Sequence, residues 1–184
     1  MRKLILSIKA LGALLLVLGV ASQAMAASSE LPRFVDNGNG TITDTLTGLM
    51  WEKKTIGSGP VTDVDLFYTW SRTGTVANGT LFTDFLARMN CTISSNRTCG
   101  PGPYSDWRIP TLAELRTILS GEFPFCVSPC IDAIFGPTQE ASYWSSTTYD
   151  VNPGSAWRVS FGDGAVLTSN KLNPRFARAV RGGR

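Results

Sequence analysis

A complete helix-start motif lies in the segment Asp106-Trp107-Arg108-Ile109-Pro110-Thr111-Leu112-Ala113-Glu114-Leu115, around which the rest of the chain is expected to pack. Pro110 ends whatever element precedes it. Thr111, followed three residues later by Glu114, is a capping box, in which each side chain accepts a hydrogen bond from an otherwise unpaired backbone N–H. The pattern therefore predicts a helix that begins at Leu112 and ends near Gly121. Its apolar side chains recur at helical spacing, so we expect a short core helix with one buried stripe: Leu112, Leu115, Ile118 and Leu119.

The residues just before this helix are expected to anchor it. Trp107 and Ile109 alternate with Arg108, so the indole and the isoleucine should enter the core while the guanidinium lies along the surface or joins a buried pair. Trp51 and Trp157 also alternate with polar neighbours, and we expect both rings in the core.

The elements on either side indicate an α+β fold with two short helices packed against antiparallel sheets and long loops. Three strands separated by Gly-containing turns are predicted over residues 33–52. Residues 55–78 are expected to form a long surface segment that its aromatic rings hold to the body of the domain, and a first helix is predicted over about 80–90. After the second helix and a Pro- and Cys-rich loop, strands are predicted over residues 142–147, 156–161, 165–168 and 176–181. In this order the N-terminal strands are free to rejoin the C-terminal ones.

The N-terminus has the pattern of an export signal. Arg2 and Lys3 precede an apolar run over about residues 10–21, and Ala24-Met25-Ala26 is a small-x-small cleavage site. The apolar run is too short to span a bilayer comfortably, and no spanning stretch follows. We expect a signal peptide over residues 1–26 and a single exported domain over 27–184, without a membrane span, in the periplasm, outside the cell or on its surface.

Removal of the signal changes the charge balance. The whole chain has 17 basic and 14 acidic residues. The signal contains three of the bases, Arg2, Lys3 and Lys9, so 17 − 3 leaves 14 bases against 14 acids. A neutral mature domain gives no support for nucleic-acid binding.

Four cysteines in an exported chain favour disulfides, and three connectivities are possible for Cys91, Cys99, Cys126 and Cys130. We prefer the two local pairs, Cys91 with Cys99 and Cys126 with Cys130, because each pair brackets a short loop of turn-forming residues. The spacings do not match paired zinc knuckles, and neither pair has the C-x-x-C form of thioredoxin-like redox sites.

No catalytic or metal site is predicted. The chain has no histidine, which removes Ser-His-Asp and Cys-His catalysis and histidine-ligated zinc. The carboxylates Asp63 with Asp65, or Glu122 with Asp132, have no fixed geometry in the sequence. The Asp- and Asn-rich segment 36–44 lacks the ligand spacing of an EF-type calcium loop, and no glycine pattern for a cofactor is present, so we expect neither metal nor cofactor.

Taken together, these motifs resemble a known bacterial family, DUF1566, which is also named for the C-terminal domain of the Legionella collagen-like adhesin. The resemblance rests on residues 36–44, 47–51, 106–115, 143–147, 156–161 and 180–183. It implies an exported or surface domain, some members serving adhesion to sulfated polysaccharide. Members often have a cysteine where this chain has Ala179, so one family bridge is not expected here.

A looser similarity links two of these motifs to formylglycine-generating sulfatase-modifying proteins. The motifs are the Trp-Arg-Ile-Pro-Thr-x-x-Glu run and the closing Val-Arg-Gly-Gly. The similarity implies a C-type-lectin-like fold. The reactive cysteines of those oxidases have no counterparts here, and the sugar-site tripeptides of calcium-dependent lectins are absent, so neither activity is implied.

The best ligand candidates lie near the C-terminus, where residues 158–184 hold six bases beside one acid, Asp163; five of these bases are Arg158, Lys171, Arg175, Arg178 and Arg181. Guanidinium forks suit sulfate and carboxylate groups, so we expect salt-sensitive, calcium-independent binding of an acidic or sulfated polysaccharide, or of a cell-surface protein. Tyr149 is the predicted stacking ring. The alternatives are a solvated face, or structural arginines paired with Asp106 or Glu114, in a scaffold of the envelope that binds no glycan.

Overall fold

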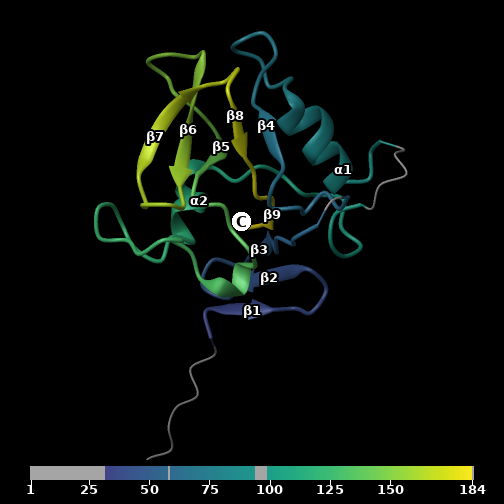
Figure 1. Ribbon diagram of the computed structural model, residues 1–184. Helices are drawn as coiled ribbons and strands as arrows, with labels where there is room; N and C mark the ends of the chain where they lie inside the picture. Colours follow the sequence, from purple (N-terminus) through teal and green to yellow (C-terminus); the bar gives the residue numbers. More distant parts are fainter. Residues whose placement is uncertain (1–31, 58, 94–98, 184) are drawn as a thin grey trace, which may run out of the picture. The chain divides into compact units, whose positions relative to one another are not determined.

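Two β-sheets and four short helical segments make up the described part of the chain (Figure 1). The computed structural model describes residues 32–57, 59–93 and 99–183. The predicted signal peptide lies outside these residues. No helix in the described ranges has the length and apolarity that crossing a membrane requires.

The first sheet joins the two ends of the described chain. Its order is β1-β2-β3-β9 and every pair is antiparallel; the strands are β1 (Phe34–Asp36), β2 (Thr41–Asp44), β3 (Leu49–Glu52) and β9 (Val180–Gly182). Gly38 and Gly40 adopt positive φ in the β1–β2 turn, the conformation expected of its Asn-Gly repeats. The expectation that N-terminal and C-terminal strands share a sheet is confirmed.

The second sheet has the order β4-β8-β5-β6-β7, with only the β5–β8 pair parallel. Its strands are β4 (Phe67–Thr69), β5 (Ser142–Thr148), β6 (Ser155–Ser160), β7 (Val166–Asn170) and β8 (Pro174–Phe176). Two expectations were wrong here. The segment 55–78 was expected to be a loop but contributes β4, and the predicted strand 176–181 is divided because residues 177–179 carry the chain from β8 in one sheet to β9 in the other.

Both predicted helices are present, with differences in detail. The first comprises a π-helical turn, η1 (Leu81–Leu86), followed by α1 (Ala87–Met89). The second, α2 (Leu112–Thr117), begins where expected but ends four residues before Gly121, because Leu119 forms a bridge with Ile131 instead of continuing the helix. A 3-10 turn, η2 (Ala133–Phe135), precedes the C-terminal strands.

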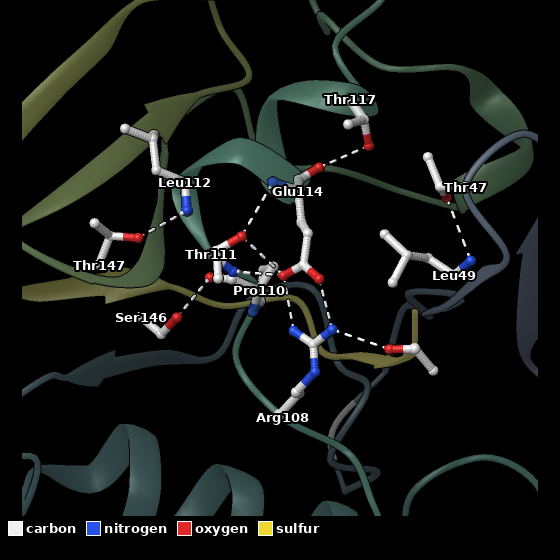
Figure 2. A network of polar contacts seen from close by, with 11 residues as sticks. Thr47, Leu49, Arg108, Pro110, Thr111, Leu112, Glu114, Thr117, Ser146 and Thr147 are labelled. Atoms are coloured by element: carbon white, nitrogen blue, oxygen red, sulfur yellow. Dashed lines mark hydrogen bonds and ion pairs between the residues drawn. The ribbon is translucent and has the colours of Figure 1, made fainter. Parts of the chain in front are cut away.

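The start of α2 ties the two sheets together (Figure 2). The capping box is formed: Thr111 Oγ1 accepts from the Glu114 N–H at 3.2 Å, and Glu114 Oε2 accepts from the Thr111 N–H at 2.8 Å. The same carboxylate receives two hydrogen bonds from Arg108, at 2.7 and 2.5 Å. Arg108 also donates to the Gly182 carbonyl at the end of β9, and Leu112 N–H donates to Thr147 Oγ1 in β5. The capping motif predicted from the sequence, together with Arg108, thus forms the joint that connects the two sheets.

The core bears out most of the predicted burial. Trp51, Trp107, Ile109 and Leu115 are buried, Trp107 being only 3 % exposed. Trp157 is an exception, because its ring is half-buried and lies outside the buried core, and Leu112 and Leu119 of the expected helical stripe are also only half-buried. Alternation alone could not show that this part of β6 is only partly covered.

Both preferred cysteine pairs are within bridging distance. The Cα atoms of Cys91 and Cys99 are 5.3 Å apart, and those of Cys126 and Cys130 are 5.6 Å apart. Each value lies in the usual range for a disulfide. The structure thus has the local connectivity.

Candidate functional site

A groove on one face of the five-stranded sheet brings together two of the five predicted ligand residues, Arg158 from β6 and Arg175 from β8. Its volume is about 420 Å³. The remaining lining comes from the segment that enters β5 and from the ends of β6 and β8: Glu140, Ala141, Ser142, Ser160, Pro174 and Phe176. Sequence reasoning missed Ser142 and Ser160, which are direct cross-strand partners. Only the strand register, which the sequence does not specify, places them beside Arg158.

Alternation along β6 turns Arg158 into this groove. Neighbouring side chains of a strand lie on opposite faces, so Arg158 and Trp157 diverge. The Arg158 guanidinium donates to the Ser142 hydroxyl and makes a longer contact, 3.4 Å from Nε, with the Thr168 carbonyl. These contacts hold the guanidinium across β5, β6 and β7, half-buried on one wall of the groove.

Arg175 is held from the opposite side. One terminal nitrogen donates to the Pro174 carbonyl at 2.9 Å and the other to Ser169 Oγ at 3.1 Å. Its Nε is buried and has no hydrogen-bond partner among the described residues. One guanidinium donor of the site is therefore left unsatisfied by the described residues.

The two arginines form a positive pair that nearby carboxylates compensate only in part. Within the described ranges, neither one forms an ion pair with a carboxylate. Desolvation lowers the pKa of Arg158, the nearby charge of Arg175 lowers it further, and the Asp163 carboxylate offsets only part of this. An anion in the groove would relieve this repulsion, because opposite charge favours the charged form of both groups.

Lys171 does not belong to this surface. It is 1 % exposed, its Nζ donates to the Thr75 carbonyl at 3.1 Å and to Thr148 Oγ1 at 2.9 Å, and it lies 3.8 Å from the Trp70 ring centroid. The expectation of a free ammonium is wrong, because Lys171 fastens the loop around Thr75 to the sheet.

Arg178 is also buried, with 0 % exposure. Its guanidinium donates to the backbone carbonyls of Glu52 and Phe135 at 2.8 and 2.9 Å, and to Thr138 Oγ1 at 2.9 Å. Burial lowers the pKa of this group. Arg178 joins η2 to β3 and cannot reach a polysaccharide outside the protein.

A buried ionic group around Glu52 was not foreseen. Glu52 Oε1 lies 2.7 Å from Lys54 Nζ, and Glu52 Oε2 accepts from the Ala179 N–H at 2.8 Å. Both side chains are at most 2 % exposed. The only sequence signal was the charged run Glu52-Lys53-Lys54 at the end of β3, which is indistinguishable from a solvated turn. Because Glu52 accepts from the Ala179 N–H, this buried group holds the segment 177–179, in which the chain passes from β8 in one sheet to β9 in the other.

Tyr149 is not beside the arginines. Its ring is half-buried and packs edge-on against Trp157, with 5.3 Å between centroids. Because Trp157 and Arg158 lie on opposite faces of β6, Tyr149 is on the face away from the groove. The expectation that it stacks on a sugar held by Arg158 is therefore wrong.

Arg181 has the structural role considered as an alternative, in which an arginine is paired with Asp106. Its guanidinium pairs with Asp106, with Nε 2.7 Å from Oδ1, and lies 3.8 Å from the Tyr104 ring centroid. The pair lowers the pKa of Asp106. Arg181 and Arg108 therefore both serve the joint around α2.

The acidic residues considered at the outset do not assemble a second site. Asp63 and Asp65 share a local turn, in which the Asp65 N–H donates to Asp63 Oδ1 at 3.1 Å. Glu122 pairs with Arg116, while Asp132 caps η2. In the described ranges, no three His, Cys, Asp or Glu side chains are grouped so that they could hold a metal ion.

One comparison with known proteins matches this chain. The model of the family described as "Lcl C-terminal domain" matches residues 40–181, which include every element from β2 to β8, the first two residues of β9 and both arginines of the groove. No curated protein matches the chain.

Proposed function

This chain belongs to the Lcl C-terminal domain family, and we propose that it is an exported adhesion domain that binds acidic or sulfated glycans in the groove between Arg158 and Arg175. The family is adhesin-like, which favours a binding domain over an enzyme. The observation on which the proposal rests is that two guanidinium groups share one groove without a paired carboxylate in the described chain.

The chemistry of the groove suits a sulfate or a carboxylate on a sugar. A planar guanidinium presents donors in a fork that matches these anions, and the partly desolvated setting strengthens the attraction. The hydroxyls of Ser142 and Ser160 line the groove, where they can bond sugar hydroxyls.

Calcium is not required by this mechanism, because both positive charges come from the chain itself. The charges are only partly buried, so added salt should weaken the attraction by screening it. An open groove of this size holds one or two charged sugar groups, so binding by a single domain should be weak.

Affinity chromatography on immobilised heparin tests the proposal. We expect the wild-type protein to be retained at low salt and to elute as salt rises, with or without a calcium chelator. Arg158→Ser with Arg175→Ser should abolish retention without unfolding the domain. The matched control is Arg72→Ser with Arg116→Ser, which removes the same charge from exposed arginines outside the groove and should leave most of the retention. Equal loss in both double variants, or no retention of the wild type, would reject the groove as a glycan site.

Export and fold complete the proposal. The two disulfides and the adhesin-like family fit an exported protein. We propose that residues 1–26 are removed as a signal peptide and that 27–184 form one domain with a C-type-lectin-like arrangement. Support for that arrangement comes from the Trp-Arg-Ile-Pro-Thr-x-x-Glu motif and from an α+β architecture whose terminal strands share a sheet.

The alternative function, a scaffold that contacts other proteins, is favoured by one observation. Three apolar side chains around the second disulfide are largely exposed: Phe123, Phe125 and Val127. Exposed apolar groups that cluster in this way mark contact surfaces more often than scattered ones do.

A further inference from the structure

The outer strand of the five-stranded sheet, β7, lacks the features that normally protect a sheet edge. It has five residues, Val166-Leu167-Thr168-Ser169-Asn170, with no charge, no proline and an unbroken register against β6. Natural edge strands are usually kept from pairing by charged residues, proline, bulges or short length. The other sheet edges in the described chain, β1, β4 and β9, have three residues each. Among the edges that the structure describes, β7 is therefore the most exposed to strand pairing (Figure 1).

The register shows which backbone groups of β7 remain available. The bonds from Ser160 N–H to the Ala165 carbonyl and from Lys171 N–H to the Gly154 carbonyl bracket the strand. Since antiparallel ladders alternate, Val166, Thr168 and Asn170 point their N–H and C=O groups away from β6. The Thr168 carbonyl takes the 3.4 Å contact from Arg158, and the Asn170 carbonyl takes one bond from Asn173, so each keeps a free lone pair.

Exposed apolar side chains flank both ends of this edge. At its start, the disulfide loop lies directly against the β6–β7 turn, where a Cβ on Gly164 would be 3.0 Å from the Gly121 carbonyl and 3.3 Å from Cys126 Cβ. This loop holds Phe125, 89 % exposed, and Val127, 83 % exposed. At the other end, Leu172 is 48 % exposed.

We propose that β7 pairs antiparallel with β7 of a second copy of this chain, forming a two-fold dimer with a continuous ten-stranded sheet. Antiparallel pairing centred on Thr168 places Thr168 opposite the second copy's Thr168, and Val166 opposite its Asn170. Every outward N–H and C=O then finds a partner. The central pair is Thr with Thr, a favourable cross-strand combination, and no like charges meet because the strand has none.

A second copy explains the positions of the apolar groups, which an unrelated strand would not. In an antiparallel pair, the start of one β7 lies beside the end of the other. The exposed loop around Phe125 is thereby brought toward the second copy's Leu172, and the two-fold axis repeats this contact at the far end. Self-complementarity of this kind is characteristic of two-fold interfaces.

The dimer would double the proposed glycan site. A two-fold axis perpendicular to the shared sheet keeps the same face of both copies on one side, so both arginine grooves face the same way. Each groove is centred on β5, between Arg158 on β6 and Arg175 on β8, so the two groove centres are five strand spacings apart, or about 24 Å across the sheet. This consequence rests on the proposed function, whereas the pairing itself does not. Two weak sites at that spacing would bind one polysaccharide chain far more tightly than one site does.

Sedimentation velocity over a concentration series tests the pairing, using protein recovered from the exported fraction. We expect reversible dimers for the wild type. Thr168→Pro removes one outward N–H per copy but none of the bonds to β6, so it should weaken dimerisation by roughly thirtyfold or more while the fold is retained. Thr168→Val is the matched control, since it keeps both the shape and the N–H, and should dimerise almost as the wild type does.

Phe125→Ser provides a second test that does not alter the strand. Its side chain is almost fully exposed, so the fold should tolerate the change while dimerisation weakens. Wild-type protein that sediments as a monomer at every concentration would overturn the proposal. So would assembly that is unaffected by both Thr168→Pro and Phe125→Ser, because it would have to use another surface. Dimers that form while heparin retention is absent would support the pairing and reject only the glycan site.

Discussion

Arg108 and Glu114 provide the sharpest quantitative prediction, because their pair holds the joint between the sheets. The change is a double-mutant cycle of Arg108→Ala and Glu114→Ala. The pair has two hydrogen bonds of 2.7 and 2.5 Å, and its side chains are 40 % and 21 % exposed. Charge-assisted bidentate pairs are strong, but the exposure of Arg108 requires a discount for solvent screening, so we expect a coupling free energy of about 1–2 kcal/mol. Glu114→Ala alone should cost about 2–3 kcal/mol, since it also leaves the Thr111 N–H unpaired.

Chemical denaturation of the four proteins measures this coupling, and the chain offers an internal control. Arg116 and Glu122 form an ion pair at 3.1 Å with side chains 52 % and 79 % exposed, so the same cycle there should give about 0–0.5 kcal/mol. If the Arg108–Glu114 coupling were no larger than that of this surface pair, the motif would not be the joint that we describe.

The coupling should also depend on pH. Burial alone would raise the pKa of Glu114, but the hydrogen bonds from Arg108 and Thr111 outweigh it, so the pKa is lower in the folded protein than in the unfolded chain. Stabilisation from a carboxyl group with a lowered pKa is fully present above its unfolded pKa and is lost as pH falls through the folded value. The coupling should therefore be constant near neutral pH and vanish in acid.

Two further predictions concern buried side chains. Trp107→Ala should cost about 3–5 kcal/mol of unfolding free energy and Thr111→Ala only about 1 kcal/mol, because the first empties a core position and the second removes one capping bond; the reverse order in denaturation experiments would contradict the assigned burial of the indole. Lys171→Met should cost about 2 kcal/mol by removing two charge-assisted hydrogen bonds and the contact with Trp70, yet it should leave heparin retention unchanged; reduced retention in the folded variant would return Lys171 to the binding surface.

The features that could be predicted from the sequence are those set by neighbouring residues. The capping box of Thr111 and Glu114 spans four positions, and the Asn-Gly turn between β1 and β2 fixes its own geometry. The cysteine pairs are eight and four residues apart. In each case the physical cause lies within one short segment, so the pattern and the structure agree.

The misassigned residues are those whose surroundings come from distant parts of the chain. Arg178 is buried against Glu52, 126 residues away, and Lys171 against Thr75, 96 residues away. Alternation in a strand tells which residues share a face, but it does not tell what covers that face. The same limit applies to β8 and β9, which read as one strand because the sequence has no signal for a change of sheet.

Binding of a sulfated glycan between Arg158 and Arg175 can be observed directly by an NMR titration of the arginine Nε–Hε signals with a sulfated heparin oligosaccharide. The account predicts that the signals of Arg158 and Arg175 shift together and saturate at one ligand concentration, while those of Arg72 and Arg116 stay in place. Shifts confined to other arginines, or no shift of Arg158 and Arg175 at low salt, would contradict it.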